Sequence, residues 1–115
     1  MSDWVYVQKD GATCDSAWSH SDGGTYVVGG TAEMALNVTY NYGKLLAEVL
    51  PGGLRGLYGK EVKEALPLLK VGVEKLVGEP SENYWEACPG NARKVLERLV
   101  QWAQEAPAGA VFDVN

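Results

Sequence analysis

The sequence predicts an α+β fold in which a small antiparallel sheet packs against three helices. Three observations predict it: polar and apolar residues alternate within the first forty positions, apolar residues recur at helical spacing from about residue 45 to 105, and a short apolar run returns at residues 110–114. The sheet should have three or four strands, formed by N-terminal hairpins and a C-terminal strand. The 115 residues, 46% of them hydrophobic, predict a single domain, residues 1–115.

The strands are predicted from β-branched and aromatic runs that lie between turn signals. These runs cover residues 4–8, 25–28 and 33–40. Asp10 and Gly11 predict a turn after the first strand, and residues 12–24 predict a loop with room for one short strand. Gly29 and Gly30 predict a tight hairpin turn, because glycine readily adopts positive φ. The run at 110–114 predicts a last strand, and the two terminal strands are candidates to pair with each other.

The helices are predicted from stripes of apolar residues. The first covers about residues 45–50 and is stopped by Pro51 and the glycines after it. The second covers about residues 60–77, and we expect a kink or a break at Pro67, which lacks a backbone donor. The third covers about residues 92–105, with Asn91 as its N-cap and Pro107 after its end.

Charge and composition exclude several classes of function. The net charge is −5, and a protein that binds duplex nucleic acid or an anionic membrane surface needs a basic face. Residues 1–41 contain one lysine and five acidic residues, so any anion site is expected after residue 41. No apolar run reaches the length of a membrane span, no signal peptide is evident, and two cysteines are too few for a disulfide scaffold. We therefore expect a cytoplasmic protein, either modestly stable alone or supplemented by self-association.

Catalytic and metal-binding patterns are weak. His20 is the only histidine, and Cys14 lies six residues before it. A Cys–His pair can form a nucleophile, but no third residue that would orient the histidine is evident. The spacing of Cys14, Asp15, His20 and Asp22 fits no established zinc pattern. An enzyme is the least favoured class, and we predict no catalytic residue, no metal and no cofactor.

The start of the third helix is the first candidate for a binding site. Arg93 and Lys94 follow the expected cap, Asn91, and two cations in a first helical turn oppose the helix dipole. An anion bound to the free N–H groups at the helix start would explain them. The alternative is that Arg93 simply pairs with Glu97 one turn later.

Two aromatic and amide clusters are the second candidate. Tyr84 and Trp85 precede the third helix and suit stacking on a planar ligand, although they also suit a core plug and a loop. Asn37, Thr39, Asn41 and Tyr42 precede the first helix. An asparagine amide donates and accepts at once, which suits a base or a ribose, although Asn41 also suits a plain helix cap.

These two clusters contain motifs that resemble those of a known protein family. The string Tyr84-Trp85-x-x-x-x-Gly90-Asn91-Ala92, with Thr39-x-Asn41-Tyr42 upstream, resembles a family of small uncharacterised proteins from bacteria and their phages. The likeness covers about residues 36–114, and Cys88 stands where the family pattern has threonine, so one hydroxyl is missing. The resemblance implies a pocket between the clusters and, through the phage connection, a protein that sequesters a host signalling nucleotide or blocks a host protein.

The sequence thus predicts a non-enzymatic protein that binds a small anionic ligand, with a nucleotide as the leading example. The predicted ligand-binding residues are Asn37, Thr39, Asn41, Tyr42, Tyr84, Trp85, Asn91 and Arg93. The alternative is a protein-interaction module, or an inhibitor of a host protein, that acts through exposed aromatic residues such as Trp4, Trp18 and Trp102.

Overall fold

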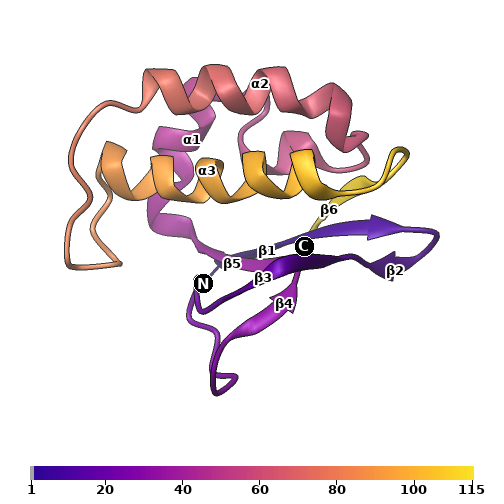
Figure 1. Ribbon diagram of the computed structural model, residues 1–115. Coiled ribbons are helices and arrows are strands. Elements are labelled where there is room, and N and C mark those ends of the chain that lie inside the picture. Colours follow the sequence, from indigo (N-terminus) through magenta and orange to yellow (C-terminus); the bar gives the residue numbers. More distant parts are fainter. Residues whose placement is uncertain (1) are drawn as a thin grey trace.

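The computed structural model describes residues 2–115 and confirms the α+β fold, with the three helices on one face of the main sheet (Figure 1). The elements are β1 (Ser2–Lys9), β2 (Ala12–Thr13), β3 (Asp15–His20), β4 (Thr31–Glu33), β5 (Ala35–Thr39), the 3₁₀ turn η1 (Tyr40–Tyr42), α1 (Gly43–Val49), the 3₁₀ turn η2 (Leu54–Leu57), α2 (Val62–Lys75), α3 (Pro89–Glu105) and β6 (Val111–Val114).

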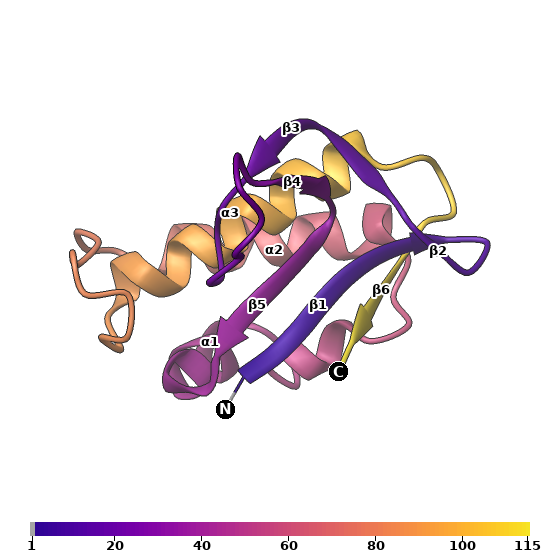
Figure 2. The ribbon, with the colours of Figure 1, turned by 90° about the horizontal axis from the view of Figure 1, so that it is seen from below.

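The main sheet is built around β1, which pairs antiparallel with every other strand of it. Residues 2–6 of β1 pair with β5, residues 8–9 with β2 and residues 5–8 with β6. The first and last strands therefore do pair, and β1 lies between β5 and β6 (Figure 2). A separate two-stranded sheet, β3 with β4, continues from this sheet and lies beside α3.

The core lies between the main sheet and the helices. Val5 and Val7 of β1 point into it, whereas Trp4 and Tyr6 stack on the opposite face with ring centroids 6.0 Å apart. Among its largest fully buried side chains are Leu69 of α2 and Leu96, Leu99 and Trp102 of α3. Burial of each leucine contributes about 1.5–3 kcal/mol, so the sheet positions α3 firmly.

Three local predictions are corrected. Residues 25–28 form no strand; they lie in a ten-residue connection, residues 21–30, between β3 and β4. Gly29 and Gly30 do adopt positive φ, but in this long loop rather than in a tight hairpin. Residues 12–24, predicted as a loop with room for one short strand, contain two strands, β2 and the six-residue β3.

The helices also differ in detail from the prediction. α2 continues through Pro67 without a break. Because Pro67 and Lys63 are both exposed, the Lys63 carbonyl that loses its helical donor remains open to water. α3 begins at Pro89, with Cys88 as its N-cap, so Asn91 is not the cap. No helix within residues 2–115 has both the length and the apolarity to cross a membrane.

Candidate functional site

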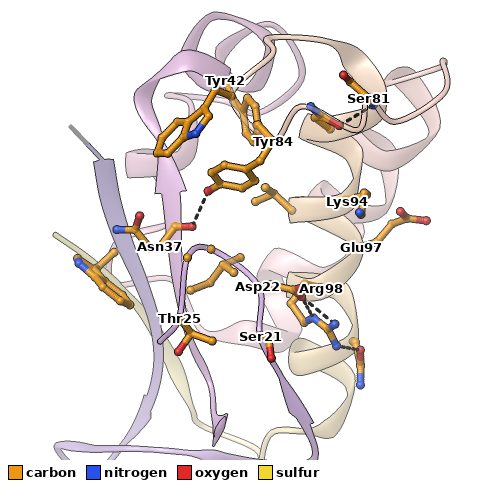
Figure 3. A pocket seen from close by; sticks show the side chains of 18 of the residues that line it. Ser21, Asp22, Thr25, Asn37, Tyr42, Ser81, Tyr84, Lys94, Glu97 and Arg98 are labelled. Atoms are coloured by element: carbon orange, nitrogen blue, oxygen red, sulfur yellow. Dashed lines mark hydrogen bonds and ion pairs between the residues drawn. The ribbon is translucent and has the colours of Figure 1, made fainter. Parts of the chain in front are cut away.

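A cavity of about 910 Å³ lies beside α3 (Figure 3). One wall is the loop of residues 21–26, which we call the β3–β4 wall. The opposite wall is the loop of residues 81–85, which we call the 81–85 wall. The floor is formed by Leu36 and Asn37 of β5, and the remaining side is the polar flank of α3. Small-ligand sites commonly have volumes of about 300–1,000 Å³, so the cavity is large enough for one.

The two predicted aromatic and amide clusters meet at this cavity. The side-chain amide of Asn41 donates to the Trp85 carbonyl at 2.8 Å, and the Tyr42 hydroxyl donates to the Tyr84 carbonyl. The Tyr84 hydroxyl donates in turn to the Asn37 carbonyl at 3.3 Å, as Figure 3 shows. Each of these polar groups therefore binds the backbone of the other cluster. The contacts make the 81–85 wall rigid and leave the aromatic faces, rather than the hydroxyls, for a ligand.

Asn91 lines the cavity, but its amide is already used. Its Oδ1 accepts from the Ser81 N–H at 2.9 Å, and its Nδ2 donates to the carbonyls of Asn83 and Glu86 at 3.0 Å each. The residue is only 6% exposed. Asn91 therefore shapes the 81–85 wall from inside α3, and it has no amide N–H left to donate to a ligand.

Thr39 and Asn37 also have local partners. Thr39 is buried, and its hydroxyl accepts from the Asn41 N–H at 3.3 Å, which caps η1. It does not line the cavity. Asn37 does, although its Nδ2 donates to the Ser2 hydroxyl at 2.6 Å. Its Oδ1 is the part of that amide that remains able to accept from a ligand.

Arg93 lies away from the cavity. Its guanidinium donates to the carbonyls of Leu76 and Gly78, at 3.0 and 2.8 Å, and so caps the C-terminal end of α2. It lies 3.8 Å from Glu97, the pairing considered as the alternative. Because α3 starts at Pro89, Arg93 and Lys94 lie beyond its first turn. Their charges therefore indicate no anion at the helix start.

The start of α3 is itself covered by the chain. Gly90 lies directly against the segment of Glu79 and Pro80, where an added Cβ would come within 2.3 Å of the Glu79 carbonyl. Nearby, the Cys88 thiol points to the same carbonyl at 4.0 Å. An anion therefore has no open approach to the helix on this side.

The polar flank of α3 supplies residues that the sequence prediction missed. Arg98 binds Asp22 of the β3–β4 wall, with its Nε and one terminal nitrogen both 2.8 Å from Asp22 Oδ2. Its other terminal nitrogen donates to Gln101 at 2.7 Å. In sequence these residues are typical of a solvated helix face. The spacing of Lys94, Arg98 and Gln101, which places them on one flank of the helix, was the sequence pattern that could have indicated this polar side of the cavity.

The β3–β4 wall depends on a glycine. Gly23 has a φ of +65°, and an added Cβ would lie 2.3 Å from the Asn37 carbonyl oxygen and 2.7 Å from the Asn37 nitrogen. Only a residue without a side chain fits there. The loop can therefore cover the edge of β5 that faces away from β1, and it closes the floor of the cavity.

Charges around the cavity nearly balance. Asp22, Glu82 and Glu97 face Lys94 and Arg98. Arg98 is paired with Asp22, so Lys94 is the lining cation with no ion pair among residues 2–115. Burial raises the pKa of Tyr42 to about 12 and also raises the pKa of Tyr84. Both phenols are thus neutral donors near neutral pH.

The comparisons with known proteins identify no relative: no family model, curated protein or solved structure matches this chain. The resemblance to small bacterial and phage proteins stays a prediction. Trp102, expected as an exposed anchor, is fully buried. Within residues 2–115, no group of three or more His, Cys, Asp or Glu side chains is arranged to hold a metal ion.

Proposed function

We propose that this protein is a non-enzymatic binding protein that holds a small planar ligand in the cavity beside α3. The observation that carries the proposal is the cavity itself, with its rigid 81–85 wall and its aromatic lining. Trp4 and Trp85 line it and expose part of their side chains to solvent, at 40% and 61%. Rings of this kind stack on planar molecules and offer large contact areas at a small entropic cost.

The ligand class that we propose carries an acidic group, as a nucleotide does, and this group contacts Lys94. Two of the three lining carboxylates already have cationic partners: Asp22 binds Arg98, and Glu97 lies 3.8 Å from Arg93. Glu82 is the lining carboxylate that opposes Lys94 without such a partner among residues 2–115. A single lysine suits one acidic group better than several.

A thermal-shift panel tests this proposal, using nucleosides and the corresponding nucleotides as probes. A ligand at one hundred times its Kd should stabilise the protein by about 2.7 kcal/mol. Trp85→Ala should remove the shift, whereas Tyr58→Ala, which removes an equally exposed ring outside the cavity, should not. Lys94→Glu should weaken the nucleotide more than the nucleoside, and Lys70→Glu on α2 is the matched control. No shift with any probe would contradict the proposal.

The second candidate function is a protein-interaction module, and one observation favours it. The apex of the β3–β4 connection presents Tyr26 and Val28 at 97% and 100% exposure, with Val27 between them. Apolar side chains gathered at a loop apex are typical of a contact with another protein. A pull-down should recover a partner that Val28→Ser loses and that Val77→Ser, at a distant exposed valine, retains. Equal recovery with both variants would argue against this candidate.

A further inference from the structure

The sole histidine of the chain has a position that the proposed binding function does not use. His20 ends β3 and is only 5% exposed. Its Nδ1 accepts from the backbone N–H of Asp22 at 3.2 Å, and its Nε2 lies 3.1 Å from the Glu33 carbonyl oxygen. Because a carbonyl can only accept, the hydrogen sits on Nε2 and Nδ1 keeps its lone pair. The ring is therefore neutral in this arrangement.

This imidazole holds the beginning of the β3–β4 wall. Residues 21–26 start directly after it, and the N–H that it binds belongs to Asp22. The next contacts along the wall are the ion pair of Asp22 with Arg98 and the tight packing of Gly23 on Asn37. The position of the first turn of the wall therefore depends on an acceptor at Nδ1.

Protonation removes that acceptor. A protonated imidazole donates from both nitrogens, so Nδ1–H would point at the Asp22 N–H, and two donors would face each other. The Asp22 amide must then turn away. Trp102 packs against the ring at a centroid distance of 5.2 Å, and its indole N–H is a donor that cannot accept the new proton.

The charged groups on the surrounding elements are already engaged or exposed. Asp22 on the loop is bound to Arg98 of α3, and Glu105 of α3 accepts from the Ser16 hydroxyl of β3. Glu33 of β4 contacts the ring through its backbone carbonyl, while its residue is exposed. No carboxylate forms a hydrogen bond with the imidazole among residues 2–115. A positive charge on the ring would thus have no hydrogen-bonded carboxylate to offset it in the closed arrangement.

We propose that His20 is a proton-sensitive latch: its protonation releases residues 21–24 and opens the β3–β4 wall of the cavity. The importance of the latch for ligand release rests on the proposed function, whereas the opening itself does not.

NMR spectroscopy of the free protein from pH 8 to pH 5 tests the latch. The ring signals of the single histidine are unambiguous, and they can be compared with the backbone amides of Asp22, Gly23 and Gly24. We expect the chemical shifts of these amides to change with pH, with the same midpoint as the chemical shifts of the ring. The hydrogen exchange of the Asp22 amide, corrected for its intrinsic pH dependence, should accelerate about tenfold, the size expected for the loss of its hydrogen bond to His20. The amides of Gly52 and Gly53, in a separate loop, should show neither change.

The variant His20→Asn is the matched control, because its side-chain oxygen can still accept from the Asp22 N–H but does not titrate. It should abolish the pH-dependent shift of the loop amides. If this variant does not fold, the comparison of the pH midpoints of ring and loop signals in the wild-type protein is sufficient to test the latch. Three results would overturn the latch: a ring that stays neutral to pH 5, loop amides that remain still while the ring titrates, or the same loop shifts in His20→Asn.

The ligand experiment separates the latch from the binding function. Failure of every probe in the thermal-shift panel would contradict the binding proposal and leave the NMR result intact. For a probe that does bind, the Kd should rise about tenfold from pH 7.5 to pH 5.5 in the wild type and should stay constant in His20→Asn. An equal rise in both proteins would show that acid weakens binding without His20.

Discussion

Gly90 gives the sharpest test of the architecture around the cavity. It lies in the first turn of α3, and an added Cβ would come within 2.3 Å of the carbonyl carbon and oxygen of Glu79 and 2.4 Å of the Pro80 nitrogen. Carbon atoms pack at about 3.5–4.0 Å, so this backbone must move by roughly 1 Å. Overpacking of this kind costs about 1–3 kcal/mol or more, and the gain from alanine in a helix is about 1 kcal/mol. Because the clash is with backbone atoms that cannot rotate away, we place Gly90→Ala at the upper end and expect a net loss of about 2 kcal/mol.

Urea unfolding followed by tryptophan fluorescence measures this loss, and Gly43→Ala is the control. Gly43 is the first residue of α1, has an ordinary helical φ of −55°, and has no atom within 4 Å of an added Cβ. Alanine there should leave stability unchanged or raise it by up to about 1 kcal/mol. If Gly90→Ala and Gly43→Ala had the same effect, α3 would not pack on residues 79–80 as described.

Three further substitutions test the roles of residues near the cavity. Asn91→Ala should lower the free energy of unfolding by about 3 kcal/mol in urea, because it removes three hydrogen bonds and leaves the Ser81 N–H without its acceptor. Arg93→Ala should lower it by about 1–2 kcal/mol through the lost cap of α2, while a thermal shift by any bound probe should stay unchanged. Tyr42→Phe should reduce the alkaline loss of stability. The folded pKa of about 12 lies above the unfolded value of 10.0, so the contribution of the phenol is complete below pH 10 and disappears as the pH rises through 12. Urea midpoints at about pH 9 and pH 11.5 measure this difference. Tyr42→Phe should still lose some stability at high pH, because the pKa of Tyr84 is also raised.

The elements with a clear hydrophobic period could be predicted from the sequence. β1, β6 and the three helices all lie where the apolar pattern indicated them. β3 was expected only as a short strand somewhere within residues 12–24, because its buried positions are Ser16 and His20, two polar residues that hide the alternation. Their burial depends on distant partners: Ser16 binds Glu105, which lies 89 positions later in the sequence.

Residues 25–28 show the opposite error. Their β-branched and aromatic composition predicted a strand, yet Tyr26 and Val28 point into solvent at the apex of a loop. Strand propensity reflects packing against neighbouring strands, and none pairs with this segment. The glycines on both sides of it adopt positive φ and turn the chain out of the sheet.

For the candidate site, the sequence predicted which segments meet but not what their polar groups do. Asn91 and Arg93 are predicted ligand-binding residues, and the structure shows both bound to backbone carbonyls of neighbouring segments. A side chain's capacity for hydrogen bonds is visible in the sequence, whereas the partners that use it are set by tertiary contacts. The early start of α3 did have a local signal, since Pro89 is typical of a first helical position.

The two walls of the cavity are held by contacts of different strength, which determines where it can open. The 81–85 wall is fixed by the cross-bonded clusters and by the buried amide of Asn91. The β3–β4 wall is held by one partly exposed ion pair, worth about 0–1 kcal/mol, by Gly23 and by the neutral ring of His20. A ligand should therefore enter by displacing residues 21–26.

Because the exposed apex at Tyr26 and Val28 belongs to the same connection, a protein bound there would move this wall as well. The two candidate functions would then be coupled through one loop, and a partner that binds the apex should change the affinity of the cavity for its ligand by the same factor as the ligand changes the affinity for the partner.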